Sequence, residues 1–168
     1  MQQFVCNKWL WMTLLYLSCI SISFGQQRFT PATYIDEYKN VAQQLMLETG
    51  VPASVILAVA MHESANGNSR IARYLNNHFG IKGKNDSKAI KSAYKGYEST
   101  LASYWDFINL LKRRKSVQSL FEGNSVTDYK PWILAIARSG YSAAKDWRHK
   151  VLATISRYNL DEYDQEVN

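Results

Sequence analysis

The sequence predicts an all-α domain, and three observations support this. Apolar residues recur at helical spacing along most of the chain, for example over 34–46. Start and stop signals for helices flank these stretches, such as Thr30-Pro31 and Gly50. Segments with the pattern of β-strands are scarce. With 168 residues, the chain is long enough for one domain with a substantial core.

We expect three helices and then a loop in the N-terminal half of this domain. Thr30 is a favourable N-cap, Gly50 a helix stop, and Pro52 a residue that starts helices more readily than it continues them. Asn68 or Ser69 caps a third, short helix. The expected elements are helices over about 31–49, 52–63 and 69–77, and a glycine-containing loop over 78–92 with at most a short strand.

The C-terminal half is predicted to be helical as well. Ser99 precedes an amphipathic stretch, Pro131 follows Asp128 at a helix start, and Gly140 ends that helix. The expected elements are helices over about 99–111, 131–139 and 145–158, with a short helical turn over 117–121.

Glu63 is the most informative residue of the chain. It follows the apolar run 55–61, and it lies on the same helical stripe as Val55 and Val59. Burial and the negative end of the helix dipole both disfavour its charged form. A carboxylic acid that keeps its proton near neutral pH can act as a general acid. The alternative is a carboxylate paired with one of the many Lys or Arg side chains.

The N-terminus has the pattern of a secretory signal peptide. Lys8 is its only charge, an apolar stretch covers 10–24, and Ser23-Phe24-Gly25 is a small-x-small cleavage site. We therefore expect a signal peptide over 1–25, a domain over 26–168, and export to the periplasm or cell envelope of a bacterium. The alternatives are an uncleaved membrane anchor and lipidation at Cys19.

Composition limits the chemistry and the partners. Cys6 and Cys19, the two cysteines, both lie in the expected signal peptide, so the mature domain would contain no disulfide and no thiolate metal site. The three histidines are widely spaced, and we expect neither a metal nor another cofactor. The net charge of +6 favours an anionic extracellular partner rather than nucleic acid. After cleavage of the signal we expect no stable membrane span, and the oligomeric state is left open.

Aromatic and amide side chains surround Glu63 in the sequence, and this composition suits a saccharide groove. Several short motifs also occur in a distinctive order. These motifs are Ala60-Met61-His62-Glu63-Ser64, Asn76-Asn77-His78-Phe79-Gly80-Ile81-Lys82-Gly83, Tyr94-Lys95-Gly96-Tyr97-Glu98-Ser99, Ser103-Tyr104-Trp105-Asp106-Phe107 and Ser139-Gly140-Tyr141. Together they resemble the glucosaminidase family of peptidoglycan hydrolases, glycoside hydrolase family 73, which includes the muramidase domain of flagellar rod-assembly proteins. The resemblance covers about residues 34–163.

The resemblance implies a lysozyme-like helical fold with a substrate groove, and a secreted endo-β-N-acetylglucosaminidase that acts on peptidoglycan. Glu63 would be its single general acid. The residues expected to bind substrate are Asn77, Phe79, Tyr97, Tyr141 and Trp147. Alternative roles are structural: Asn77 could cap a helix, Phe79 could fill the core, and the aromatic residues could be core as well. Asp106 is expected to hold the groove wall.

The sequence also departs from the family pattern. The family's β-hairpin lobe offers a second carboxylate, but the segment between Gly83 and Tyr94 is too short for that lobe. Its one acidic residue is Asp86. The motif after Tyr141 is altered, and Trp147 stands where the family has a tyrosine. Three alternatives therefore remain beside the hydrolase: a weak or inactive peptidoglycan-binding module, a lytic transglycosylase or muramidase that uses the same Glu63, and a structural domain of a secretion or flagellar assembly.

Overall fold

The computed structural model describes residues 28–123 and 127–165, and the expected signal peptide lies outside these residues. Within them the chain is mostly helical, and the isolated antiparallel bridge between Lys82 and Tyr94 is the one strand-like pairing. The prediction of an all-α fold is confirmed. None of the described helices combines the length and the apolar character needed to cross a bilayer.

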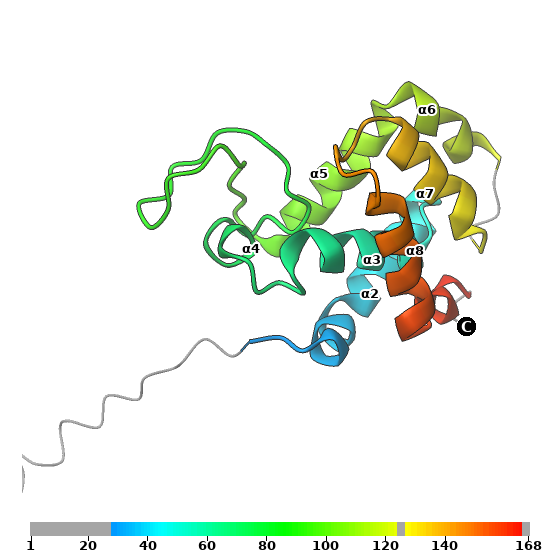
Figure 1. The fold of residues 1–168 in the computed structure, drawn as a ribbon, viewed down its shortest axis with the longest axis horizontal. Coiled ribbons are helices and arrows are strands. Elements are labelled where there is room, and N and C mark those ends of the chain that lie inside the picture. The colour runs from blue at the N-terminus through cyan, green and yellow to red at the C-terminus, as the bar shows by residue number, and fades with distance from the viewer. Residues whose placement is uncertain (1–27, 124–126, 166–168) are drawn as a thin grey trace, which may run out of the picture.

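The first two described helices, α2 (Pro31–Thr49) and α3 (Ala53–Ser64), pack side by side, and α3 lies at the centre of the molecule (Figure 1). The ends of α2 are as the sequence predicts: Thr30 and Thr33 form a reciprocal capping box, and Gly50 ends the helix with φ +77°. In α3, every residue from Ala53 to Met61 is buried. Such a helix is stable only when other elements cover it on all sides.

The rest of the chain forms two lobes, and three of its elements pack against α3 (Figure 1). The C-terminal helix α8 (Trp147–Tyr158), the 3-10 helix η3 (Leu160–Asp164) and α7 (Tyr129–Arg138) pack against it. The other elements are α4 (Arg70–Leu75), α5 (Thr100–Lys112), α6 (Lys115–Gln118) and η2 (Ser119–Glu122). The predicted helix start at Pro131 is too late, because Asp128 caps the helix and Pro131 sits in its first turn.

A hairpin loop over 81–96 projects from one side and forms the smaller lobe (Figure 1). Its two arms are joined by backbone hydrogen bonds from Gly83 to Ala93 (2.9 Å) and from Lys95 to Ile81 (2.9 Å). The side chain of Asn85 donates across the loop to the carbonyls of Ser92 and Tyr94, among other contacts. The sequence predicted a lobe that is short or absent, and the structure has a short hairpin without regular strands.

The start of α3 is capped by a residue from the other end of the chain. Pro52 offers no side-chain hydrogen bond, and Asp164 supplies the cap instead. Its carboxylate accepts from the Ser54 backbone N–H at 2.7 Å and from the Ser54 hydroxyl at 2.6 Å. Burial raises the pKa of Asp164 from 3.8 to about 6, although the hydrogen bonds from Ser54 lower it. Neither this contact nor η3 was predicted from the sequence.

We predict that Asp164 makes stability depend on pH. Because its folded-state pKa lies above the unfolded value, its protonated form stabilises the fold, fully below about pH 4, and this contribution is lost as the pH rises through 6. The unfolding free energy of the wild type, relative to Asp164→Asn, should fall by at most about 3 kcal/mol over this range. Denaturant titrations at several pH values measure it. If the difference in unfolding free energy between the two proteins did not vary with pH, the raised pKa of Asp164 would be contradicted.

Candidate active site

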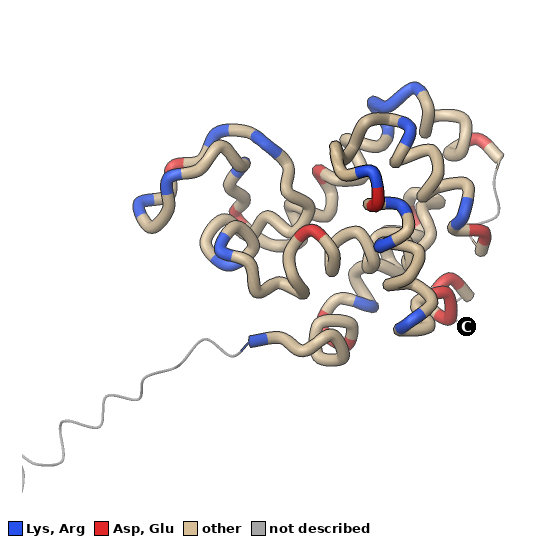
Figure 2. The backbone as a smooth tube through the Cα atoms, viewed as in Figure 1, with Lys and Arg blue, Asp and Glu red and all other residues tan. Residues whose placement is uncertain are grey.

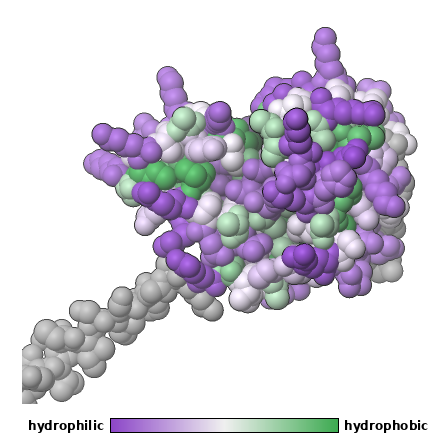
Figure 3. Space-filling model, in the orientation of Figure 1, coloured by the Kyte–Doolittle hydropathy of each residue, from purple (hydrophilic) through white to green (hydrophobic). Residues whose placement is uncertain are grey.

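Glu63 lies in the last turn of α3, where the helix leaves the core and ends at Ala65 in a left-handed conformation (φ +51°). Its side chain is partly exposed and borders a cleft of about 420 Å³. Figure 3 shows the molecule indented between its two lobes. The cleft is lined by Glu63, Phe79, Gly80, Ile81, Lys82, Leu110, Arg114, Tyr141 and Ser142. None of the ion pairs among the described residues involves Glu63, so the alternative of a paired carboxylate does not apply within them.

One oxygen of Glu63 is held by Trp147, the first residue of α8. The indole Nε1–H donates to Oε1 at 2.7 Å. The ring itself is only 2% exposed and packs at 5.4 Å from the ring of Tyr141. Its face is therefore not available for stacking on a sugar, which is the role expected from sequence. Trp147 instead holds the Glu63 carboxylate through its indole N–H.

The other oxygen of Glu63 lies beside Gly80. A Cβ atom at this glycine would be 3.5 Å from Oε2, and the backbone there has φ +63°, a conformation that favours glycine. The absence of a side chain at this position keeps Oε2 accessible from the cleft. The two carboxylate oxygens thus have different environments: Oε1 accepts from an indole N–H in the core, and Oε2 faces the cleft lining.

Tyr141 comes from the turn between α7 and α8 and borders the same cleft. Its hydroxyl donates to the backbone carbonyl of Phe79 at 2.8 Å, which ties the turn to the cleft floor. Burial, together with the nearby Glu63 carboxylate, raises the pKa of Tyr141 well above its usual 10. The hydroxyl therefore keeps its proton and remains a donor at neutral pH.

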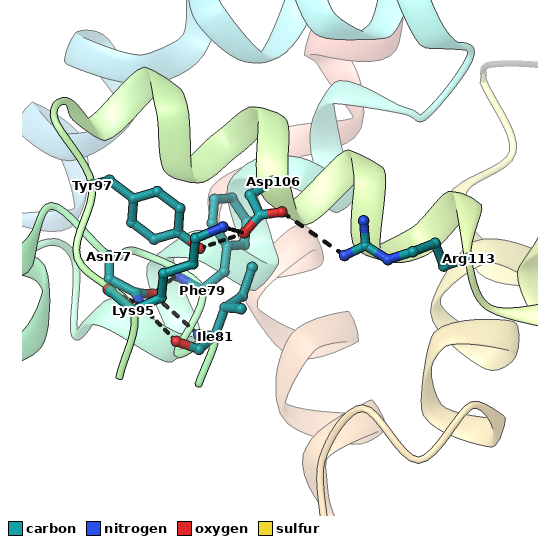
Figure 4. A network of polar contacts seen from close by, with 7 residues as sticks. All are labelled: Asn77, Phe79, Ile81, Lys95, Tyr97, Asp106 and Arg113. Carbon is teal, nitrogen blue, oxygen red and sulfur yellow. Dashed lines mark hydrogen bonds and ion pairs between the residues drawn. The ribbon is translucent and has the colours of Figure 1, made fainter. Parts of the chain in front are cut away.

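Asn77 and Phe79 shape the cleft floor from below. The side-chain amide of Asn77 donates to the carbonyls of Ile81 and Lys95, both at 2.8 Å, and its oxygen accepts from the N–H groups of Phe79 and Ile81. Both donors of the amide are thus used within the protein (Figure 4). Phe79 is 2% exposed, and its ring stacks on that of Phe107 with the ring centroids 4.3 Å apart. The packing of Phe79 matches its structural alternative of filling the core, whereas Asn77 does not cap a helix but ties the loop residues together, and Asn76 is the C-cap of α4.

Asp106 fastens the hairpin lobe to α5 (Figure 4). Its Oδ2 accepts from Lys95 Nζ at 2.7 Å and from the Tyr97 hydroxyl at 2.8 Å, and its Oδ1 lies 3.8 Å from Arg113. Burial raises the pKa of Asp106, but the hydrogen bonds from Lys95 and Tyr97 outweigh it, and the net pKa is below the usual value. Asp106 thus joins these residues to α5, and neither it nor its three partners belongs to the described lining of the Glu63 cleft.

Tyr97 is not among the residues that line the Glu63 cleft. Besides its bond to Asp106, it borders a second pocket of about 370 Å³, to which Tyr74 and Asp86 also contribute. Asp86, the acidic residue of the hairpin segment, therefore does not line the Glu63 cleft. The structure brings Glu63, Phe79, Tyr141 and Trp147 together, with Asn77 beneath them.

Six of the nine residues that line the cleft were not predicted from the sequence, among them Gly80, Lys82 and Arg114. Gly80 and Lys82 lie inside a motif that carries the family resemblance, so this motif could have indicated that they line the cleft. Arg114 belongs to the basic run 112–115 at a helix end, where cations ordinarily offset the helix dipole. Only the turn between α5 and α6 places its side chain at the cleft, and no local pattern predicts this.

A helical domain with an acid at the end of its central helix, in a cleft between two lobes, belongs to the class of lysozyme-like domains. Residues 39–160 match the glucosaminidase family, described as mannosyl-glycoprotein endo-beta-N-acetylglucosaminidase. The match covers more than half of the chain, and the protein belongs to this family.

Individual relatives agree with this assignment. The chain is 32% identical over 155 residues to the exo-glucosaminidase LytG of Bacillus subtilis (strain 168), with 80% of this chain and 54% of LytG covered. It therefore spans about half the length of that relative. The catalytic domain of the autolysin Auto from Listeria monocytogenes has the same fold (TM-score 0.66, 21% identity, 97% and 99% covered). The C-terminally truncated glycoside hydrolase domain of FlgJ from Salmonella typhimurium also has this fold. Its TM-score is 0.62 at 20% identity, with 77% of this chain and 98% of that domain covered.

We predict that Trp147→Phe impairs turnover more than its effect on stability explains. The change removes the donor to Glu63 and a small volume of buried ring. Trp132→Phe is a matched control, because Trp132 is fully buried and its Nε1 has no hydrogen-bond partner within the described chain. Both variants should lose about 1–3 kcal/mol of stability. Only Trp147→Phe should lower kcat, about tenfold or more. Equal kcat values for the two variants would contradict the positioning role.

Proposed function

We propose that the protein is a peptidoglycan hydrolase that cleaves the glycan strand at N-acetylglucosamine, with Glu63 as its general acid. Family membership supports the reaction class. The observation that carries the assignment of the acid is the placement of Glu63: partly exposed at a cleft, held by Trp147, and without an ion-pair partner among the described residues. The name of the relative LytG specifies exo action, and the family description specifies endo action.

The cleft favours a mechanism that needs one carboxylate. Glu63 is the one acidic residue in the lining of the cleft as described, whereas glycosidases of the usual type place two carboxyl groups across the bond. In the proposed mechanism, the carbonyl oxygen of the sugar's own N-acetyl group attacks the anomeric carbon. The glycosidic C–O bond breaks, and Glu63 transfers its proton to the departing oxygen.

The second step regenerates the acid. The carboxylate of Glu63 accepts a proton from water as that water attacks the anomeric carbon, which opens the cyclic intermediate and leaves a reducing end. Attack by the sugar's 6-hydroxyl group instead of water would give an anhydro end, the product of a lytic transglycosylase. Both routes need one proton donor that later acts as a base.

We further propose that the protein acts outside the cytoplasm, in the cell envelope or periplasm. Two features support this location. The substrate class of the family is found there, and residues 1–25 have the pattern of a signal peptide. The basic net charge of +6 is compatible with an anionic wall.

We predict that Glu63→Gln abolishes the release of soluble glycan from purified peptidoglycan sacculi. The substitution keeps the shape of the side chain and an acceptor for Trp147 but cannot transfer a proton, so we expect a loss in kcat of about 10³-fold or more with an almost unchanged melting temperature. Turbidity and chromatography of the products measure it. Wild-type activity in the variant would remove Glu63 from the mechanism.

The same digestion separates the alternatives. Reducing ends on the products indicate hydrolysis, and anhydro ends indicate a transglycosylase. Wild-type protein that pellets with sacculi but releases nothing would identify a binding module, and protein that neither pellets nor releases products would indicate a structural domain. The size distribution of early products distinguishes endo from exo cleavage.

A further inference from the structure

The cleft beside Glu63 has an excess of positive charge. Its described lining contains one carboxylate, Glu63, and two cations, Lys82 and Arg114. Lys82 comes from the hairpin lobe and Arg114 from the turn between α5 and α6, so the two approach from different lobes. Figure 2 shows that Lys and Arg residues occur along both lobes. A cleft with this balance of charge attracts an anionic ligand.

Arg114 is the better anchored of the two cations. Its backbone N–H donates to the carbonyl of Leu111 at 2.9 Å, and its own carbonyl accepts from Val117 and Gln118. The residue is half-buried, and its guanidinium donates through Nη1 to the carbonyl of Ser139 at 3.0 Å. These bonds fix the side chain at the edge of the cleft.

Most of the hydrogen-bonding capacity of Arg114 remains unused. A guanidinium has five N–H donors, and the described residues accept one hydrogen bond from it. No carboxylate of the described residues lies within 4.0 Å of it. The neighbouring cations Lys95 and Arg113 differ, because both lie against Asp106. A partly buried cation without a counter-charge is costly unless a ligand supplies one.

We propose that Arg114, assisted by Lys82, binds a carboxylate of the substrate next to the glycosidic bond at Glu63. This rests on the proposed function. A planar guanidinium matches a carboxylate with two parallel hydrogen bonds, and the mobile ammonium of Lys82 adds charge from the opposite lobe. The site therefore selects glycan strands that bear a carboxylate near the scissile bond over neutral N-acetylated glycans.

Peptidoglycan offers such a carboxylate from two sources. One is the lactyl group of a muramic acid residue whose peptide has been removed, and the other is the stem peptide. Three substrates distinguish them: strands freed of peptide by an amidase, strands that keep their peptides, and peptide-free strands whose carboxylates have been converted to methylamides.

The experiment measures kcat/KM of the wild type, Arg114→Gln, Lys82→Gln and Lys115→Gln on the three substrates. The amide introduced by Arg114→Gln is still a hydrogen-bond donor, and Lys115 is an exposed neighbour that does not line the cleft, so Lys115→Gln is the matched control. We expect the wild type to cleave a carboxylate-bearing strand at least about tenfold better than the methylamide. Arg114→Gln should lose about 10–100-fold on that strand and change less than about threefold on the methylamide. Lys82→Gln should show a smaller loss of the same kind.

The outcomes separate this proposal from the proposed function. Equal cleavage of the carboxylate and methylamide strands by the wild type would overturn the carboxylate site and leave the hydrolase intact. Equal losses in Arg114→Gln on all three substrates would show a structural role only. No cleavage of any substrate would overturn the proposed function itself. If Arg114→Gln does not fold, the wild-type preference and its loss in Lys82→Gln still decide the question.

Discussion

The burial of α3 is the constraint on which the rest of the structure depends. From Ala53 to Met61 this helix has no exposed face, so α2, α7, α8 and η3 must surround it. The backbone of a helix satisfies its own hydrogen bonds along its length but not at its ends. At the start of α3 the partner comes from a distant segment, because Asp164 accepts from the Ser54 N–H. At the other end the carbonyls of Met61 and Ser64 accept from the nearby N–H groups of Asn66 and Ser69.

The position of the cleft follows from this constraint. A charged side chain cannot be placed in the middle of an all-round buried helix without a large desolvation cost, so Glu63 lies where α3 emerges from the core. The last turn is then fixed from beneath: the Ser64 hydroxyl donates to the Ala60 carbonyl and accepts from the Gly67 N–H. Beside the acid, α8 contributes Trp147, whose helix is anchored by the buried Val151 and Ile155. The acid is thus held by the same packing that stabilises the fold.

Local signals explain how much the sequence could predict. The caps at Thr30, Ser69 and Ser99 act within three residues, and the predicted boundaries there agree with the structure. Glu63 could be found because the helix around it is otherwise apolar. The contacts that give the site its geometry are not local: 84 residues separate Trp147 from Glu63, and 110 separate Asp164 from Ser54. For Trp147, the sequence indicated an aromatic ring near the acid but not whether the ring face or its N–H would point to the site.

The two oxygens of Glu63 are distinguished by their surroundings, and this bears on the direction of proton transfer. Oε1 accepts the indole N–H, so a proton on the acid is placed on Oε2, beside Gly80, where no side chain blocks the approach from the cleft. The same oxygen can later accept a proton from water that enters there. Lys95 and Arg113 lie against Asp106 and do not line the cleft, so Lys82 and Arg114 are the two cations of the described lining. The protein thus places its proton donor and these two cations along one cleft, and a strand bearing a carboxylate can contact both at once.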